Sequence, residues 1–140
     1  FYQLATQHKR YTKRIIKRMT KNFSIGEFEC KCGCVMPDEV LYNVVKLANQ
    51  LQTIRDVIKT PIQINSAYRC SKHNKVINGS VSSQHILGKA ADIVVRGYDP
   101  SLEIYPLIEE LINEGLILQG GLGDYPTFTH YDIRKTKARW

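Results

Sequence analysis

The chain of 140 residues is long enough for one domain with a single hydrophobic core. Hydrophobic residues make up 43% and charged residues 24%, a balance typical of globular proteins and not of disordered ones. No apolar run approaches the roughly 20 residues of a membrane-spanning helix. The first 20 residues also lack the apolar run of a secretory signal peptide.

The net charge of +7 comes entirely from the amino-terminal end of the chain. Residues 1–21 hold seven of the 20 basic residues and no acidic residue. Residues 22–140 hold the other 13 basic residues and all 13 acidic residues, so their charges cancel. The seven are Lys9, Arg10, Lys13, Arg14, Lys17, Arg18 and Lys21. We expect residues 1–21 to be a basic arm or helix that contacts anionic wall polymer, and residues 22–140 to be the folded domain. Because that domain is neutral, specific nucleic-acid binding is not expected, and an arm that binds nucleic acid is the rival interpretation.

The first half of the domain is predicted to contain a loop, a long helix, a strand and a short helical turn. Residues 22–36 form the loop, and the helix follows from about Glu39 to Ile58. Apolar residues recur in it every three or four positions, the period of a helix with one buried face. They are Leu41, Val44, Val45, Ala48, Leu51 and Ile54. Thr60-Pro61 ends this helix, alternation predicts a strand over 62–66, and residues 71–77 predict the turn.

The second half is predicted to contain two strands around one helix. Asp99-Pro100 marks the start of the helix, because a capping carboxylate precedes a proline, and Gly115 marks its end. Pro106 predicts a kink or a late start. The strands are Ala90–Val95 and Phe128–Arg134, and residues 120–123 are expected to be a turn or strand edge. Strands and helices do not alternate regularly, which predicts a single α+β domain with an antiparallel sheet flanked by helices.

Two of these strands carry side chains that can bind a metal. The chain has four histidines, which are His8, His73, His85 and His130. Side chains alternate along a strand, so His130 and Asp132 share one face of the last strand. If this strand pairs with the strand at 90–95, Asp92 and His130 face the same cleft. His85 then enters from the loop before Asp92.

The chemistry of these three side chains favours zinc. Two imidazoles and one carboxylate are a donor set of catalytic zinc sites, which keep a fourth position for water. Gly88 and Ala90 are expected to keep the approach to the metal open. The spacing alone is a weak signal, because His85 and His130 are equally compatible with partly buried histidines and Asp92 with a strand-end acid.

Residues 83–92 make the zinc interpretation specific. Their sequence, SQHILGKAAD, fits the pattern S-x-H-x-x-G-x-A-x-D at every specified position and resembles the zinc D-alanyl-D-alanine carboxypeptidase and dipeptidase family, peptidase family M15. Residues 65–70, 120–125 and 128–134 resemble further segments of that family. The resemblance covers about residues 22–140 and is greatest to short phage and bacterial members.

The resemblance implies a fold shared with the Hedgehog amino-terminal signalling domain and a zinc peptidase site. His85, Asp92 and His130 would be the zinc ligands. Arg69 would pair with the substrate carboxylate or the developing oxyanion, because its guanidinium is a fixed planar charge. Ser83 would hold the peptide or brace its own loop.

The resemblance also implies the substrate and its location. Members of the family cleave stem peptides of peptidoglycan next to D-amino acids, as D,D-carboxypeptidases or endopeptidases. We therefore expect a monomeric zinc peptidase in the periplasm or cell wall, with phage or cellular origin left open. An endolysin that cuts the L-Ala-D-Glu bond is one alternative. A catalytically silent zinc-binding module of the same fold is the other.

One position departs from the family pattern. Several members carry a carboxylate three residues before the last histidine as general base, and this chain has Thr127 there, which cannot accept a proton from water at neutral pH. Asp132 is the candidate base, because it lies on the strand face of His130. The equally weighted alternative is a carboxylate that orients an imidazole. Asp124 is the third choice.

Four cysteines remain outside this site. They are Cys30, Cys32, Cys34 and Cys70. A disulfide from the loop at 30–34 to Cys70, a second structural zinc and simple reduced thiols are three open interpretations. A disulfide would suit an exported domain.

Overall fold

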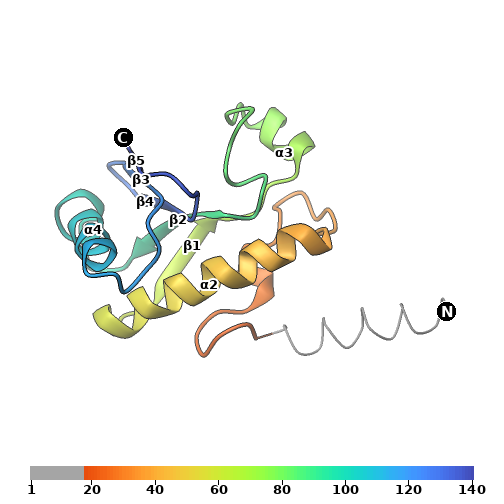
Figure 1. Ribbon diagram of the computed structural model, residues 1–140. Helices are drawn as coiled ribbons and strands as arrows, with labels where there is room; N and C mark the ends of the chain where they lie inside the picture. The colour runs from red at the N-terminus through yellow and green to blue at the C-terminus, as the bar shows by residue number, and fades with distance from the viewer. Residues whose placement is uncertain (1–17) are drawn as a thin grey trace.

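The computed structural model describes residues 18–140 (Figure 1). Its elements are η1 Ile25–Phe28, α2 Asp38–Ile58, β1 Ile62–Ser66, α3 Ser71–Val76, β2 Ala90–Val95, η2 Pro100–Ile104, α4 Tyr105–Asn113, β3 Gly121–Asp124, β4 Thr129–Asp132 and β5 Ala138–Arg139. The basic arm lies outside the described residues apart from residues 18–21, so its conformation and its partner stay predictions. None of the helices within residues 18–140 has the length and apolarity to cross a bilayer.

The long helix α2 forms as its apolar period predicts, one residue earlier than expected. Its buried side chains are Val44, Leu47, Ala48, Leu51 and Ile54. The helix ends at Lys59, whose left-handed backbone (φ 53°) lets its N–H donate to the Arg55 carbonyl. Pro61 then prevents any continuation of the helix and leads into β1.

The second long helical segment has two parts, because Pro106 cannot donate a hydrogen bond within a helix. Asp99 begins the segment, and its side chain accepts hydrogen bonds from the N–H groups of Ser101 and Leu102. The single π-helical turn η2 follows, and α4 starts only at Tyr105. Pro106 therefore lies in the first turn of α4, where its missing N–H costs nothing. The predicted late start is confirmed.

The five strands form one sheet in the order β1-β2-β4-β3-β5. The pairs β1–β2, β2–β4 and β3–β4 are antiparallel, which confirms the predicted α+β fold with an antiparallel sheet, and β5 adds in parallel to β3. Of residues 120–123, expected to be a turn or strand edge, residues 121–123 belong to β3 in the interior of the sheet. The strand at 128–134 is shorter than predicted, and the predicted loop at 22–36 contains the turn η1.

The two faces of the sheet have different environments. On one face, Ile93 of β2, Leu122 of β3 and Tyr131 of β4 join the apolar sides of α2 and α4 in one core. Figure 1 shows α2 running alongside β1, while α4 contacts β3 and η2 contacts β4. Because side chains alternate along each strand, Asp92 and His130 point to the other face. The candidate metal ligands are therefore built on the sheet and kept apart from the core.

Candidate metal centre

The register of β2 and β4 places Asp92 directly opposite His130. The predicted pairing of the two strands and the shared face of these two side chains are thereby confirmed. His130 Nδ1 lies 2.9 Å from Asp92 Oδ1. Both side chains are rigidly placed, because each is fixed by a strand in the middle of the sheet.

His85 reaches this face from the loop that precedes β2. The N–H of His85 donates to Ser83 Oγ (3.2 Å), and the His85 carbonyl accepts from the N–H of Arg69 (3.1 Å). Gly88 lets the same loop pack on α2, because a Cβ at this position (φ +72°) would lie 2.6 Å from Val40 Cγ1. Close packing on α2 therefore explains Gly88, and its role in keeping the approach to the metal open stays a prediction.

The His85 imidazole is held in the tautomer that a metal ligand needs. Its Nδ1–H donates to the carbonyl of Ala67 at 2.6 Å, which leaves Nε2 without a proton. Nε2 faces Asp92 Oδ2 at 3.3 Å. Since the ring is only 3% exposed, the Ala67 contact fixes both its orientation and its free lone pair.

His130 is oriented in the same way by a carboxylate. Its Nε2–H donates to Asp132 Oδ2 at 2.8 Å, so Nδ1 is the nitrogen directed at Asp92. The remaining capacity of Asp132 is taken up by the N–H of Gly121 (2.9 Å) and by the backbone and guanidinium of Arg134. Asp132 has no exposed surface. These contacts support the orienting role of Asp132 over the role of general base.

Gly121 is part of the Asp132 site because of its size. In the sheet it lies opposite Asp132, and a Cβ on it would meet the Asp132 Oδ2 atom at 2.3 Å. Any larger residue would push the carboxylate away from His130. The glycine run at 120–123 is thus explained by close approach in the sheet as well as by flexibility.

Hydrogen bonds between the histidines and the carboxylates favour the charged forms of Asp92, Asp132 and His130. Burial alone would raise the pKa of Asp92, but hydrogen bonds from His130 and His85 outweigh burial and hold this pKa well below its usual range. Burial would raise the pKa of Asp132 too, and hydrogen bonds from Arg134 and His130 hold it well below the usual range. Burial would lower the pKa of His130, whereas its bonds to Asp132 and Asp92 raise it.

These residues fit a zinc ion. One donor atom each from His85, Asp92 and His130 lies within 4.8 Å of the other two. Two imidazole nitrogens and one carboxylate oxygen leave a fourth tetrahedral position for water or substrate. Each imidazole donates the N–H of its other ring nitrogen to an oxygen acceptor, as histidines that ligate metals do.

An aromatic wall beside the site was not predicted. The Trp140 ring lies 5.0 Å from the His130 ring, and its Nε1–H donates to the Tyr125 hydroxyl at 2.7 Å. A Cβ on Gly123 would lie 2.7 Å from Trp140 Nε1, so only glycine gives the indole room. The Arg134 guanidinium stacks on the same ring at 5.2 Å. The signal in the sequence was the alternation of Gly121 and Gly123, the two positions that face Asp132 and Trp140.

Arg69 lies at the edge of the site with part of its charge buried. Its Nε is buried and has no hydrogen-bond partner within residues 18–140. Burial lowers the pKa of Arg69, and the nearby charges of Asp92 and Cys30 act in the opposite direction. The backbone N–H of Arg69 donates to the His85 carbonyl at 3.1 Å, which holds Arg69 next to the loop of His85, and its role in binding substrate stays a prediction. Ser83 contacts the backbone of His85, as the bracing interpretation expects.

Thr127 and Asp124 lie in, and next to, the turn between β3 and β4. Thr127 is exposed in the turn between β3 and β4. Asp124 pairs with Thr129 in the sheet, one position beyond the pair of Gly123 and His130. Alternation therefore points Asp124 to the opposite face, where it accepts a hydrogen bond from Ser101 of η2 (2.6 Å). Its contacts do not support a role as base.

An α+β domain with two histidines and one aspartate gathered on one face of its sheet belongs to the class of proteins that can hold a metal with an open coordination position. The comparison with protein families gives the particular family. The chain matches the model of the family described as Peptidase M15 over residues 20–132, and it belongs to this family of zinc-dependent metallopeptidases. A search of the curated proteins found no match.

Proposed function

We propose that the protein is a peptidoglycan peptidase that hydrolyses stem-peptide amide bonds next to D-amino acids. The observation that carries the proposal is the convergence of His85, Asp92 and His130 on one face of the sheet in a member of the peptidase M15 family. Cleavage of a terminal bond would make it a D,D-carboxypeptidase, and cleavage of a cross-link would make it an endopeptidase.

The ligand residues prepare the site for a metal with an open position. A bound zinc ion supplies Lewis acidity and lowers the pKa of a water molecule toward about 7. His85 offers Nε2 because Ala67 holds its other nitrogen, and His130 offers Nδ1 because Asp132 holds its other nitrogen. With a single carboxylate, Asp92, three protein ligands leave a divalent cation with one unit of positive charge, which favours an anionic substrate.

Arg69 would add specificity for a carboxylate. It is half-buried and close enough to Asp92 for that charge to influence its pKa. A planar guanidinium can form two parallel hydrogen bonds to a carboxylate. The terminal carboxylate of a stem peptide would fit this arrangement, and Ser83 would keep the loop of His85 in register with it.

Asp132 acts in this proposal as a positioning residue. Its oxygens are occupied by His130, Gly121 and Arg134, and none is exposed for a water molecule. The contacts of Asp132 and Asp124 do not suit either carboxylate to replace the base that is missing at Thr127, so the catalytically silent zinc module is the second candidate.

The test is digestion of intact and solubilised peptidoglycan by the zinc-loaded protein, followed by mass spectrometry. Free D-alanine would show carboxypeptidase activity, and monomeric muropeptides from cross-linked ones would show endopeptidase activity. Separation of L-Ala from D-Glu would favour the endolysin alternative. Full zinc content with unchanged muropeptides would overturn the enzymatic proposal and leave the silent module. His85→Ala is the matched control.

The proposed substrate determines the proposed location. Peptidoglycan lies in the cell wall, so we propose that the protein acts in the periplasm or cell wall. We propose separately that it acts as a monomer. Fractionation and size-exclusion chromatography test these two points.

A further inference from the structure

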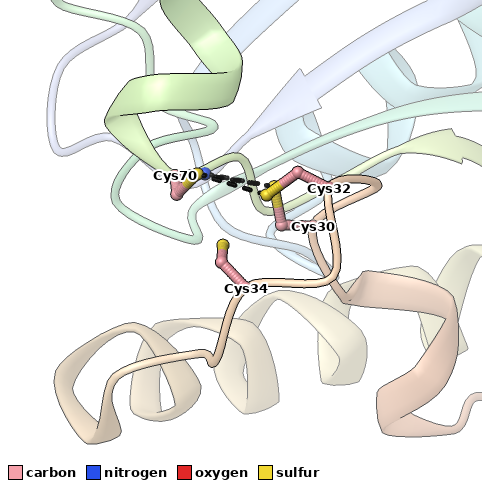
Figure 2. A group of neighbouring side chains, drawn as sticks. All are labelled: Cys30, Cys32, Cys34 and Cys70. Carbon is pink, nitrogen blue, oxygen red and sulfur yellow. Dashed lines mark hydrogen bonds between the residues drawn. The ribbon is translucent and has the colours of Figure 1, made fainter.

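Four cysteine sulfurs converge about one point outside the peptidase site (Figure 2). Cys30, Cys32 and Cys34 come from the loop between η1 and α2, and Cys70 precedes α3. One Sγ from each lies within 4.8 Å of the other three. Figure 2 shows the Cys34 side chain pointing toward the other three sulfurs. We call these residues the cysteine cluster.

The spacing of the sulfurs matches a metal site better than a disulfide. Cys30 Sγ lies 3.3 Å from Cys32 Sγ and 3.8 Å from Cys70 Sγ, and Cys32 Sγ lies 3.5 Å from Cys70 Sγ. A disulfide joins sulfurs at about 2.05 Å. Four sulfurs placed tetrahedrally at about 2.3 Å from a zinc ion are about 3.8 Å apart. All four cysteines are free.

The loop is folded so that three neighbouring cysteines can bind one ion. Gly33 adopts φ +80°, and its N–H donates to the Cys30 carbonyl at 3.0 Å, which reverses the chain within the loop. In an extended chain Cys30, Cys32 and Cys34 would lie along a line on one side. The turn instead wraps their sulfurs around a common centre, a role for which glycine is suited.

Two backbone groups already point at the sulfurs as they do in thiolate sites. The N–H of Cys70 donates to Cys30 Sγ at 3.4 Å. The N–H of His73 donates to Cys70 Sγ at 3.4 Å. Hydrogen bonds of this kind stabilise the charged form of the acceptor and orient metal ligands. Cys30 is also buried, at 4% exposure, which leaves its sulfur directed into the cluster.

We propose that the cysteine cluster binds a structural zinc ion through four thiolates. Soft thiolate ligands in a tetrahedral set select zinc, and four protein ligands close the site to water and substrate. Each thiol releases its proton to solvent when its sulfur coordinates the ion, and no oxidation or reduction takes place. The proposal is independent of the peptidoglycan substrate.

Such an ion would also support the peptidase site. It would join the loop at 30–34 to the segment 67–70, whose Tyr68 N–H already donates to the Phe28 carbonyl at 3.1 Å. The same segment supplies the Ala67 carbonyl that fixes the His85 ring. A metal at the cysteine cluster would therefore steady a segment that orients one ligand of the peptidase site.

The first test uses the unmutated full chain reconstituted with Co²⁺ in place of zinc. The ligands His85, Asp92 and His130 contain no sulfur, so thiolate-to-cobalt charge-transfer absorption would report on the cysteine cluster alone. We expect this absorption together with two metal ions per chain. Its absence from the fully loaded protein would overturn the proposal, and so would the finding of disulfides by thiol titration of freshly purified, denatured protein.

The second test compares zinc contents of variants. We expect two zinc ions per chain in the unmutated protein and one in Cys32→Ser/Cys34→Ser. His85→Ala should keep one ion, with only sulfur in its first shell by X-ray absorption. Val35→Ser is the matched control, because Val35 lies in the same loop and is 81% exposed; it should keep both ions.

The outcomes separate this proposal from the proposed function. A His85→Ala protein without zinc, or one whose zinc has nitrogen and oxygen neighbours only, would overturn the structural site. A silent peptidase assay with two bound zinc ions would overturn the proposed activity and leave the structural site intact.

Discussion

The two groups of side chains that can hold a metal are built on different supports. Asp92 and His130 depend on the register of two central strands, His85 enters from the preceding loop, and hydrogen bonds to the Ala67 carbonyl and to Asp132 fix the two imidazoles. The cysteine cluster depends on one loop turn and on the residue before a short helix. The first group offers three ligands, and the second offers four.

The difference explains how one small domain can use the same metal in two ways. Three rigidly placed ligands leave a position for a reactant, and the surrounding hydrogen bonds set the donor atoms in advance. Four ligands leave no such position, so an ion there contributes binding free energy to folding. A substitution in one group should leave the metal content of the other group unchanged, and a substitution outside both should leave both ions in place.

The largest effect is expected from His85→Ala. The variant removes an imidazole ligand at the peptidase site, and we expect peptidase activity to fall more than about a hundredfold, beyond the loss typical of outer-shell changes. Metal analysis should show one zinc ion fewer per chain. A variant that keeps its full zinc content would refute the ligand assignment.

Cys34→Ser is expected to lower the free energy of unfolding more than it lowers peptidase activity. A ligand that binds only the folded state stabilises it by about 2.7 kcal/mol at one hundred times its Kd. We expect a loss of about this size in the free energy of unfolding, measured by urea denaturation in zinc-buffered solution. Val35→Ser should be unchanged. Equal stability of Cys34→Ser and the unmutated protein in excess zinc would contradict a structural ion.

Asp132→Asn separates the orienting role from the role of base. An orienting carboxylate contributes about 10–100-fold to metal affinity. We expect zinc at the peptidase site to bind more weakly by that factor, and saturating zinc to restore most of the activity. Activity that stays lost in the fully loaded variant would instead make Asp132 the base. Zinc at the cysteine cluster should not change.

Arg69→Met tests a residue that touches both groups through the backbone, since its N–H donates to the His85 carbonyl and Cys70 follows it in the chain. A charged hydrogen bond contributes about 1.5–3 kcal/mol, so kcat/KM for a substrate with a terminal carboxylate should fall roughly tenfold to a hundredfold. Zinc content should stay constant. An amidated substrate should lose little, and an equal loss with both substrates would argue against carboxylate recognition.

The smallest effect is expected outside both groups, at the pair of Glu109 and Arg139. The Arg139 guanidinium donates to both Glu109 oxygens (2.6 and 2.9 Å) and joins β5 to α4. Glu109→Gln should lower the free energy of unfolding by about 0.5–1 kcal/mol at neutral pH. Thermal or urea denaturation would measure this loss, and both zinc ions should remain.

The pH dependence of that loss has a definite sign. Hydrogen bonds from Arg139 lower the pKa of Glu109 from its ordinary value of 4.5. The pair therefore stabilises the folded state above pH 4.5, and its contribution disappears as pH falls through the lower folded-state pKa. The unmutated protein and Glu109→Gln should converge in stability in acid. A difference that persists there would show that packing, and not charge, is responsible.

Local patterns in the sequence predicted the helices, three of the strands and the shared face of Asp92 and His130. These features follow from short-range periodicity, because a buried helix face repeats every three or four residues and a strand face every two. Pro106 and Lys59-Thr60-Pro61 also act locally, and the ends of the helices lie close to the predicted positions. The family motif at 83–92 was equally readable without a fold.

The sheet order and the surroundings of the ligands depended on contacts between distant segments. Gly121 lies in an interior strand only because β5 pairs with its far side, and two residues are too few to predict a strand. The burial of Asp132, the position of Trp140 over Gly123 and the meeting of Cys70 with the loop at 30–34 likewise arise when remote parts of the chain pack together. Residue types therefore indicated which atoms could bind a metal, and packing decided which of them meet, how each is oriented and which remain accessible to a substrate.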